Sequence, residues 1–392
     1  MQVHQRQEEQ SNSVVAYGDR FLLKFFRRIE EGLHPELEMG VYLTETAEFP
    51  HIAPVAGAIE YRRAEGNVMT VGMLQGFVEH RQTAWDAALD ALESFLQAVS
   101  LDPPIALPES DVPDKRGLVE LAAQPLAKLA QRFLGSYLET IRLLGRRTAE
   151  LHKALSAATD DPAFRPEPFL PFHQKALYQS VRGALGRALR TLHTQLDGLP
   201  QELREPAERL CELGSGRLAT LRDRLQQDLV ATRIRCHGHY SLDDVLCKAD
   251  DFVIIDFEGD PDLSIAQRRA KASPLRDIAG MLWSFDRVAL RSLDEYCAVT
   301  EVDQAERVRL TAWLDFWRAW TGAEFVRSYL ATAGESPIIP RPQKAIQALL
   351  DLYFAERCAT ALDHDLENQP SEAILSLRQM QRFLESADPA QQ

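Results

Sequence analysis

The strongest constraint on the fold of this sequence is one short β-prone run inside a region with helical periodicity. The run FVII at residues 252–255 lies between Asp250-Asp251 and Asp256, which is the pattern of a buried strand with polar ends. On both sides of the wider segment 234–255, apolar residues recur at spacings of three and four, as in amphipathic helices. We therefore expect a helical domain that carries one inserted β element.

The first 80 residues have a different character, with β-prone runs and turns around one helix. Gly18-Asp19 separates two such runs and predicts a hairpin. The expected strands are 13–17, 20–26, 53–62 and 67–75, and the expected helix is 35–43, which begins with proline. The pattern predicts an α+β fold of two lobes: a small β-rich lobe over 1–80 and a large, mainly helical lobe over 81–392.

Composition excludes several classes of protein. Of 392 residues, 45% are hydrophobic and 26% charged, as in soluble globular proteins. A net charge of −14 argues against nucleic acid as a partner. No apolar run approaches the ~18 residues of a membrane helix, and the polar start MQVHQRQEEQSN is not a signal peptide. Five cysteines without CxxC spacing predict free thiols in the cytoplasm.

Lys24 ends the apolar strand segment FLLK. A lysine there reaches nucleotide phosphates if a carboxylate on a neighbouring helix holds it. Glu38 is the first candidate for that carboxylate and Glu36 the second. The alternative is an ordinary lysine at a strand edge, facing solvent.

Asp256 follows the buried run directly, and a carboxylate at the mouth of a strand is well placed to bind Mg²⁺, which takes oxygen ligands. The segment HGHYSLDD at 237–244 lies about a dozen residues upstream. If the two β segments around it pair, Asp244 and Asp256 form a metal pair. The alternative is an aspartate that caps a turn.

The same region permits a zinc site. Its ligands would be Cys236, His237, His239 and Cys247. Their spacing fits no common structural zinc pattern, and four ligands on one hairpin are hard to arrange tetrahedrally. We therefore favour the magnesium interpretation.

Taken in order, these segments resemble one family, the maltokinases, including the kinase half of trehalose synthase–maltokinase fusions. That family shares the two-lobed, protein-kinase-like fold of aminoglycoside phosphotransferases. The resembling stretches span nearly the whole chain and include EQSNSVVAYGDRFLLKFFRRIEEGLHPELEMGVYLTE, LGRRTAELH and DFVIIDFEGDPDLSIAQRRAKASPLRDIAGM. The resemblance implies an enzyme that uses ATP and Mg²⁺ to convert maltose to maltose 1-phosphate.

The resemblance also implies roles for individual residues that bind the nucleotide. The ATP-contacting lysine falls on Lys24 and its partner carboxylate on Glu38. The remaining positions are Ser11, Asn12 and Ser13 for the phosphate loop, and Gln75, Phe77 and Val78 for the hinge that meets adenine. From the residues alone, the Ser11–Ser13 segment is only a weak phosphate cradle, because it lacks glycine, and a plain turn is the alternative.

For metal and catalysis, the resemblance implies that Asp256 binds Mg²⁺ and that Arg276 and Asp277 brace the catalytic loop. That loop resembles the family's HGDYHLGQVL and reads HGHYSLDDVL here. His239 stands where the family has the aspartate that orients the substrate hydroxyl, and Asp244 replaces a metal-binding glutamine. A neutral imidazole accepts a hydrogen bond but lacks negative charge, and losing a positioned base costs about 10²–10⁴ in rate.

Near the carboxyl end, the family pattern resembles EKALYELRYEL, whose tyrosines line the sugar site. The corresponding segment here is ERCATALDHDL, with Arg357, Thr360 and His364 at the matching positions. We therefore expect poor maltose affinity. Three other rings could replace the tyrosines, with core packing as the alternative for each: Tyr178, Trp283 and Tyr296.

Two functions stay open from the sequence. The first is an ATP- and Mg²⁺-dependent sugar kinase of maltokinase type, weak or altered in substrate. The second is a pseudokinase that serves as a binding or regulatory partner of a trehalose synthase or another α-glucan enzyme. A third, less favoured, is a helical binding protein without a nucleotide site. Because the chain begins almost at the phosphate loop, we expect the amino-terminal lobe to lack the family's usual cap.

Overall fold

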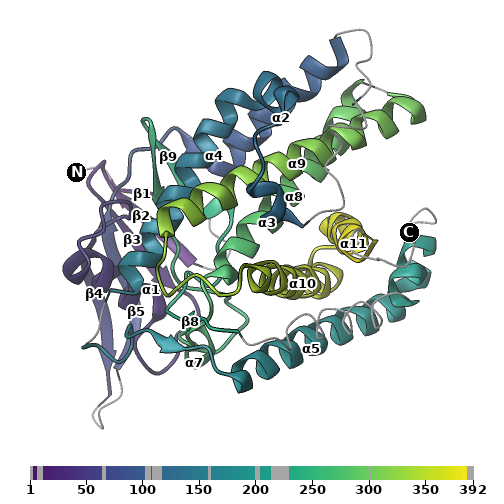
Figure 1. Ribbon diagram of the computed structural model, residues 1–392. Helices are drawn as coiled ribbons and strands as arrows, with labels where there is room; N and C mark the ends of the chain where they lie inside the picture. Colours follow the sequence, from purple (N-terminus) through teal and green to yellow (C-terminus); the bar gives the residue numbers. More distant parts are fainter. Residues whose placement is uncertain are drawn as a thin grey trace. The chain divides into compact units, whose positions relative to one another are not determined.

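The computed structural model describes residues 3–6, 12–63, 68–101, 107, 117–157, 160–198, 204–212, 229–300 and 302–385 (Figure 1). The chain forms two compact units, each built from three stretches. Unit 1 comprises Met1–Ala87, Arg147–Glu167 and Arg233–Asp277, and unit 2 comprises Ala88–Arg146, Pro168–Thr232 and Ile278–Gln392. Unit 1 thus joins the amino-terminal sheet to segment 237–244. The predicted lobes 1–80 and 81–392 divide the chain differently and stay a prediction.

The larger sheet of unit 1 is antiparallel, with strand order β1-β2-β3-β5-β4. Its strands are β1 (Val3–Arg6), β2 (Asn12–Tyr17), β3 (Phe21–Phe26), β4 (Val55–Arg62) and β5 (Val68–Gly76). The predicted hairpin is confirmed: β2 pairs with β3, and Gly18 turns between them with φ +60°. Glycine adopts that left-handed conformation without steric cost.

Helix α1 (Pro35–Val41) and the π-helical turn η1 (Tyr42–Thr46) follow the β2–β3 hairpin. Proline at the start of α1 presets the first helical φ angle. Leu37 packs against Phe26 and Met73 of the sheet in a small buried cluster. A Cβ atom at Gly40 would lie 2.6 Å from Val55 Cγ2, so glycine permits the close contact between α1 and β4.

The inserted β element is confirmed as an antiparallel hairpin of β9 (Val245–Lys248) and β10 (Asp251–Ile254), with β6 (Gln82–Thr83) beside β9. The short 3-10 turn η3 (Leu242–Asp244) leads into β9. Because Val245 pairs with Ile254, the residues that flank the hairpin, Asp244 and Ile255, are hydrogen-bonded neighbours: the Ile255 N–H donates to the Asp244 carbonyl at 2.9 Å.

The rest of the described chain is mainly helical. The helices are α2 (Ala84–Leu101), α3 (Leu118–Ala122), α4 (Lys128–Leu155), α5 (Pro171–Gln195), η2 (Leu196–Gly198), residues 204–212, α7 (Ile265–Arg268), α8 (Leu275–Thr300), α9 (Gln304–Ala333), α10 (Gln343–Asn368) and α11 (Pro370–Glu385). The short strands β7 (Glu167–Pro168) and β8 (Thr232–Arg233) pair with each other. A small β-sheet lobe followed by a mostly helical part confirms the predicted α+β class.

The interior of unit 2 is built on aromatic rings from three helices. Trp313 of α9 is fully buried and meets Phe95 of α2 and Phe133 of α4 edge to face, with centroids 6.0 and 5.5 Å apart. Such pairs are favourable beyond the area that they bury. Leu92, Phe95 and Leu96, which form one stripe of helical spacing, are all buried, as their periodicity predicts.

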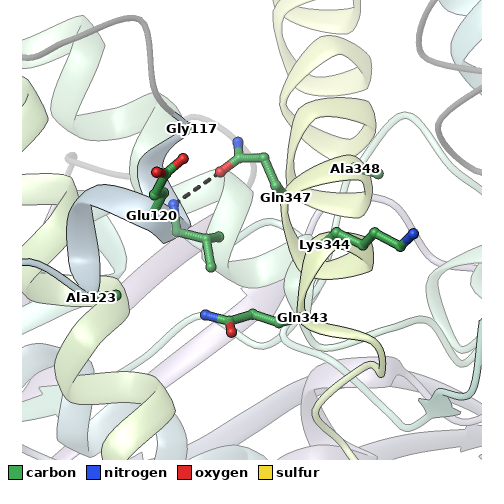
Figure 2. Close-up of a pocket in the computed structure, with 8 residues that line it drawn as sticks. Gly117, Glu120, Ala123, Gln343, Lys344, Gln347 and Ala348 are labelled. Atoms are coloured by element: carbon green, nitrogen blue, oxygen red, sulfur yellow. Dashed lines mark hydrogen bonds between the residues drawn. The ribbon is translucent and has the colours of Figure 1, made fainter.

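A second contact in unit 2 joins α3 to α10. Figure 2 shows the Gln347 side chain facing the start of α3, where its Oε1 accepts a hydrogen bond from the Val119 N–H at 3.0 Å. The two helices border a cavity of about 610 Å³ whose rim includes Glu120 and Lys344. Among the described residues, we find no helix with the length and apolar character that crossing a membrane requires.

Candidate functional site

Lys24 lies at the centre of a buried ionic cluster in unit 1. On β3 it is paired with Val14 and Met73 of the adjacent strands, and its side chain is 2% exposed. The Nζ atom lies 2.6 Å from Asp256 Oδ1 and 3.2 Å from Glu36 Oε1. A buried ammonium group requires such partners, because desolvation of an isolated charge is costly. The structure therefore brings together Lys24 and Asp256, 232 residues apart in the sequence.

The predicted pairing of Glu38 with Lys24 is wrong. Glu36, the second candidate, contacts the lysine, whereas Glu38 accepts hydrogen bonds from Arg235 at 2.6 Å and from Arg269 at 2.9 and 2.5 Å. Residues two apart on a helix project about 200° from each other. Only one of the two carboxylates can therefore face β3.

Asp256 has a left-handed backbone, with φ +66°, a conformation that aspartate tolerates better than most residues. Burial alone would raise the pKa of its carboxyl, but the adjacent Lys24 ammonium lowers it below the usual value. Asp256, Glu36 and Glu258 each offer an oxygen within 4.8 Å of the others. The Asn12 amide donates to both Glu258 oxygens at 3.2 and 3.3 Å.

Glu258 was missed by sequence reasoning. It stands two residues after Asp256, in the segment DFEG that follows the buried strand. That spacing was the available signal.

Asp244 lies beside this cluster, at the end of η3. Its Oδ2 accepts hydrogen bonds from the Ser241 N–H at 2.7 Å and the Ser241 hydroxyl at 2.9 Å. Burial and the negative charge of Asp256 raise its pKa well above the usual value. The Asp244 carbonyl accepts a hydrogen bond from Ile255, the residue before Asp256. The three-carboxylate group of the described residues comprises Glu36, Asp256 and Glu258, and Asp244 is not one of its members.

Segment 237–244, which we term the HGH loop, is held by one buried carboxylate. Asp277 accepts hydrogen bonds from the N–H groups of His237 at 2.8 Å and Gly238 at 2.9 Å, and it lies 3.0 Å from His152 Nε2. Burial opposes ionisation of Asp277, but the contact with His152 lowers its pKa. Gly238 has φ +88°, which favours glycine.

This arrangement agrees with a bracing role for Asp277. The bracing role of Arg276 stays a prediction; it is half-buried, and its N–H donates to Ser273. His152 was missed by sequence reasoning, because 125 residues separate it from Asp277.

The histidines of the loop have different surroundings. His237 is buried between the rings of Tyr240 and Phe257, and its Nε2 lies 2.9 Å from the Ile255 carbonyl. Burial lowers its pKa, which favours the neutral form. His239 is half-buried. The residues considered for zinc form no group of ligand atoms close enough to share a metal within the part of the chain that the structure describes. The Cys236 thiol donates to backbone carbonyls, as does the His237 ring.

Of the predicted phosphate-loop residues, Ser11 is outside the described residues. Ser13 belongs to the expected strand 13–17, and that strand, β2, begins one residue earlier, at Asn12. Asn12 and Ser13 pair with Phe26 and Phe25 of β3. Their contact with phosphate stays a prediction. Ser13 Oγ accepts a hydrogen bond from Arg27 at 3.3 Å.

The predicted adenine hinge follows the end of β5. Gln75 pairs with Leu22 of β3. The Phe77 N–H donates to the Arg20 carbonyl at 2.9 Å, and the Val78 carbonyl lies 2.8 Å from His80 Nδ1. Their contact with adenine stays a prediction.

Of the three rings considered for the sugar site, all in unit 2, Trp283 is buried, whereas Tyr178 of α5 and Tyr296 of α8 are half-buried. Trp283 of α8 is 8% exposed, and the guanidinium groups of Arg287 and Arg357 pack over its ring, 5.1 and 4.5 Å from the ring centroid. This arrangement agrees with core packing rather than sugar stacking. Thr360 is half-buried and His364 exposed on α10.

Comparison with known proteins gives a fold but no family. No family model matches the chain. The structure is similar to glucosamine kinase in crystal form B, with a TM-score of 0.67 and 17% identity over 97% of this chain and 76% of that chain. A glucosamine kinase in complex with glucosamine, ADP and inorganic phosphate gives 0.65 and 16%, over 98% of this chain and 81% of that chain. The chain therefore has a protein-kinase-like fold of the kind seen in glucosamine kinase.

Proposed function

We propose that the protein is an ATP- and Mg²⁺-dependent phosphotransferase that acts weakly on a sugar hydroxyl, in the manner of a maltokinase. The observation that carries this proposal is the 2.6 Å contact between Lys24 and Asp256, in the same unit as the HGH loop. Strand-borne lysine and metal-binding aspartate are two recurring parts of phosphoryl-transfer sites in kinases. The glucosamine and ADP bound by the similar kinase support a sugar acceptor and an adenine nucleotide.

The carboxylates fit a divalent cation. Glu36, Asp256 and Glu258 place three oxygens close together opposite one ammonium group, and Mg²⁺ prefers oxygen ligands. The charge of Asp256 also raises the pKa of Asp244, so a cation nearby would relieve repulsion. Asp256 and Glu258, with Asp244 beside them, would hold Mg²⁺, which neutralises phosphate charge when bound. Lys24 would then contact the phosphates.

His239 would meet the acceptor hydroxyl. The backbone just before it is held by Asp277, which accepts hydrogen bonds from the N–H groups of His237 and Gly238. In its neutral form it accepts a hydrogen bond from that hydroxyl, but it lacks the negative charge of a carboxylate in that place. Slow transfer follows from this substitution.

The alternative is a pseudokinase that binds a nucleotide and serves a trehalose synthase or another α-glucan enzyme. Two observations favour it: His239 occupies the position of the expected aspartate, and Trp283 is enclosed by Arg287 and Arg357. Both observations concern residues expected to bind the acceptor sugar, not residues expected to bind the nucleotide.

The test is to incubate the purified protein with Mg²⁺, ATP and maltose, glucose or glucosamine in turn, and to detect sugar phosphate by mass spectrometry. Asp256→Asn is the inactive control. Sugar phosphate from the wild type alone supports the kinase. Mg·ADP binding that requires Asp256, without any sugar phosphate, supports the pseudokinase. Failure to bind the nucleotide would refute both.

A further inference from the structure

The second glutamate of α1 forms an ionic bridge that the candidate reaction does not use. Glu38 is 8% exposed and is clamped by two arginines. Arg235 is 2% exposed and donates through Nη1 at 2.6 Å, and Arg269 donates through Nε and Nη2 at 2.9 and 2.5 Å. A carboxylate that receives three charge-assisted hydrogen bonds is strongly fixed in orientation.

The two arginines belong to segments on either side of the HGH loop and β9–β10 hairpin. Arg235 stands two residues before His237. Arg269 follows α7, three residues before Ala272, which exchanges two backbone hydrogen bonds of 2.9 Å with Ile234. These contacts form a closed path. Glu38 bonds to Arg235, whose neighbour Ile234 pairs with Ala272, and Arg269, three residues before Ala272, bonds back to Glu38. The base of the loop is therefore tied to α1.

A second pair holds the same segment. Arg268 donates to Glu30 at 3.0 Å, and the Glu30 carboxylate also accepts a hydrogen bond from the Ile265 N–H at 3.4 Å. The segment from α7 to Arg269 is thus attached to the amino-terminal part of unit 1 at two points.

We propose that Glu38 is a positioning residue, which holds the HGH loop in register with α1 and hence with the Lys24–Asp256 pair. A buried ion cluster adds little net stability compared with apolar residues of the same size. We therefore expect the Glu38 contacts to act on the orientation of the HGH loop. On the opposite side of α1, Glu36 contacts Lys24. Helix α1 therefore connects Lys24 to the HGH loop. A catalytic role for this connection rests on the proposed function.

The test is hydrogen exchange, which needs no catalytic activity. In the wild type, the amides of His237 and Gly238 are bonded to Asp277. In Glu38→Gln, exchange of peptides covering 237–244 should accelerate roughly tenfold to a hundredfold, the equivalent of one hydrogen bond to a charged group. Exchange of β5, residues 68–76, should stay unchanged. No acceleration, or an equal acceleration in β5, would overturn the proposal.

Glu167→Gln is the matched control. Glu167 is also clamped by two cations, Arg233 at 2.5 Å and Lys271 at 2.7 Å, in the same unit. It should leave exchange of the HGH loop unchanged, and an equal effect there would show that loss of any clamp suffices. If Glu38→Gln does not fold, Arg269→Gln replaces it as the test, because Arg269 is 37% exposed. Loss of this arginine should accelerate exchange of the HGH loop more mildly, and no acceleration would overturn the proposal.

Turnover gives the second readout. If the protein is a kinase, Glu38→Gln should lower kcat more than about tenfold, as expected for a lost positioning contact. The affinity for Mg·ADP should change less than about threefold, because Lys24 and Asp256 are retained. A protein without sugar-phosphate formation would refute the proposed function but leave the exchange result as a test of the bridge.

Discussion

The nucleotide side of the candidate site, in unit 1, and the helices assigned to the sugar, in unit 2, differ in how their side chains are engaged. In unit 1, the Asp256 carboxylate is 35% exposed beside the buried Lys24 ammonium, so a ligand or cation can still reach it. In unit 2, Trp283 is enclosed by Arg287 and Arg357. The groups expected to bind a nucleotide are thus accessible, whereas Trp283, one of the three rings considered for the sugar, is buried. The proposed nucleotide binding and the proposed sugar phosphorylation can therefore be tested separately.

The largest effect is expected from His239→Asp. If the nucleotide side is intact and this position is the main defect, sugar-dependent ADP formation should rise by an order of magnitude or more, within the ~10²–10⁴ of a positioned base. Assays against maltose, glucose and trehalose measure it. His193→Asp, at an exposed position on α5, is the control. A fast wild type with no gain in the variant would mean that the catalytic position is misassigned.

Trp283→Ala tests whether the ring belongs to the core. Removal of a buried tryptophan should cost about 3–5 kcal/mol of unfolding free energy, as measured by urea denaturation. Maltose binding, followed by calorimetry, should be weak in the wild type and unchanged in the variant under conditions where both are folded. A small stability loss combined with weaker sugar binding would instead make Trp283 part of the sugar site.

Asp256→Asn tests the nucleotide side directly. A ligand at 100 times its Kd stabilises the folded state by about 2.7 kcal/mol, so Mg·ATP should raise the melting temperature of the wild type. The variant should lose most of that shift, because the cation loses a charged ligand. Asp250→Asn, at an exposed position of the same hairpin, should keep it. A full shift in Asp256→Asn would contradict the proposed metal site.

The smallest expected effect concerns pH. Burial and the nearby Arg268 and Lys24 charges lower the pKa of His34 to about 3, against the opposing effect of Asp256. Below pH 6.5 the unfolded chain binds a proton at this histidine and the folded chain does not. The free energy of unfolding therefore decreases as the pH is lowered. The loss from this group between pH 7 and pH 5 is about 2 kcal/mol.

His34→Phe keeps a ring against Phe26, which stacks on His34 at 3.7 Å, and removes the titration. Urea unfolding at pH 7 and pH 5 should show a shallower fall for the variant. An identical slope in both proteins would show that His34 titrates normally in the folded state.

Local pattern was sufficient for the element types and for two of the central residues. The β-prone runs, the hairpin at Gly18 and the position of Asp256 after a buried strand all depend on neighbours within a few residues. Lys24 was identified by its place at the end of an apolar strand. Its partner was misidentified, because both Glu36 and Glu38 lie on one short helix and only the orientation of that helix distinguishes them.

By itself, the sequence determined an α+β chain with a sheet-forming start, one inserted hairpin, a lysine on an apolar strand and an aspartate directly after a buried strand, since backbone periodicity and turn chemistry are local properties. Only the tertiary structure decided which charges meet. Asn12 bonds to Glu258 across 246 residues, Glu38 to Arg235 across 197, and His152 to Asp277 across 125. Such pairings follow from the packing of whole elements, because a buried charge is stable only where another element supplies its partner.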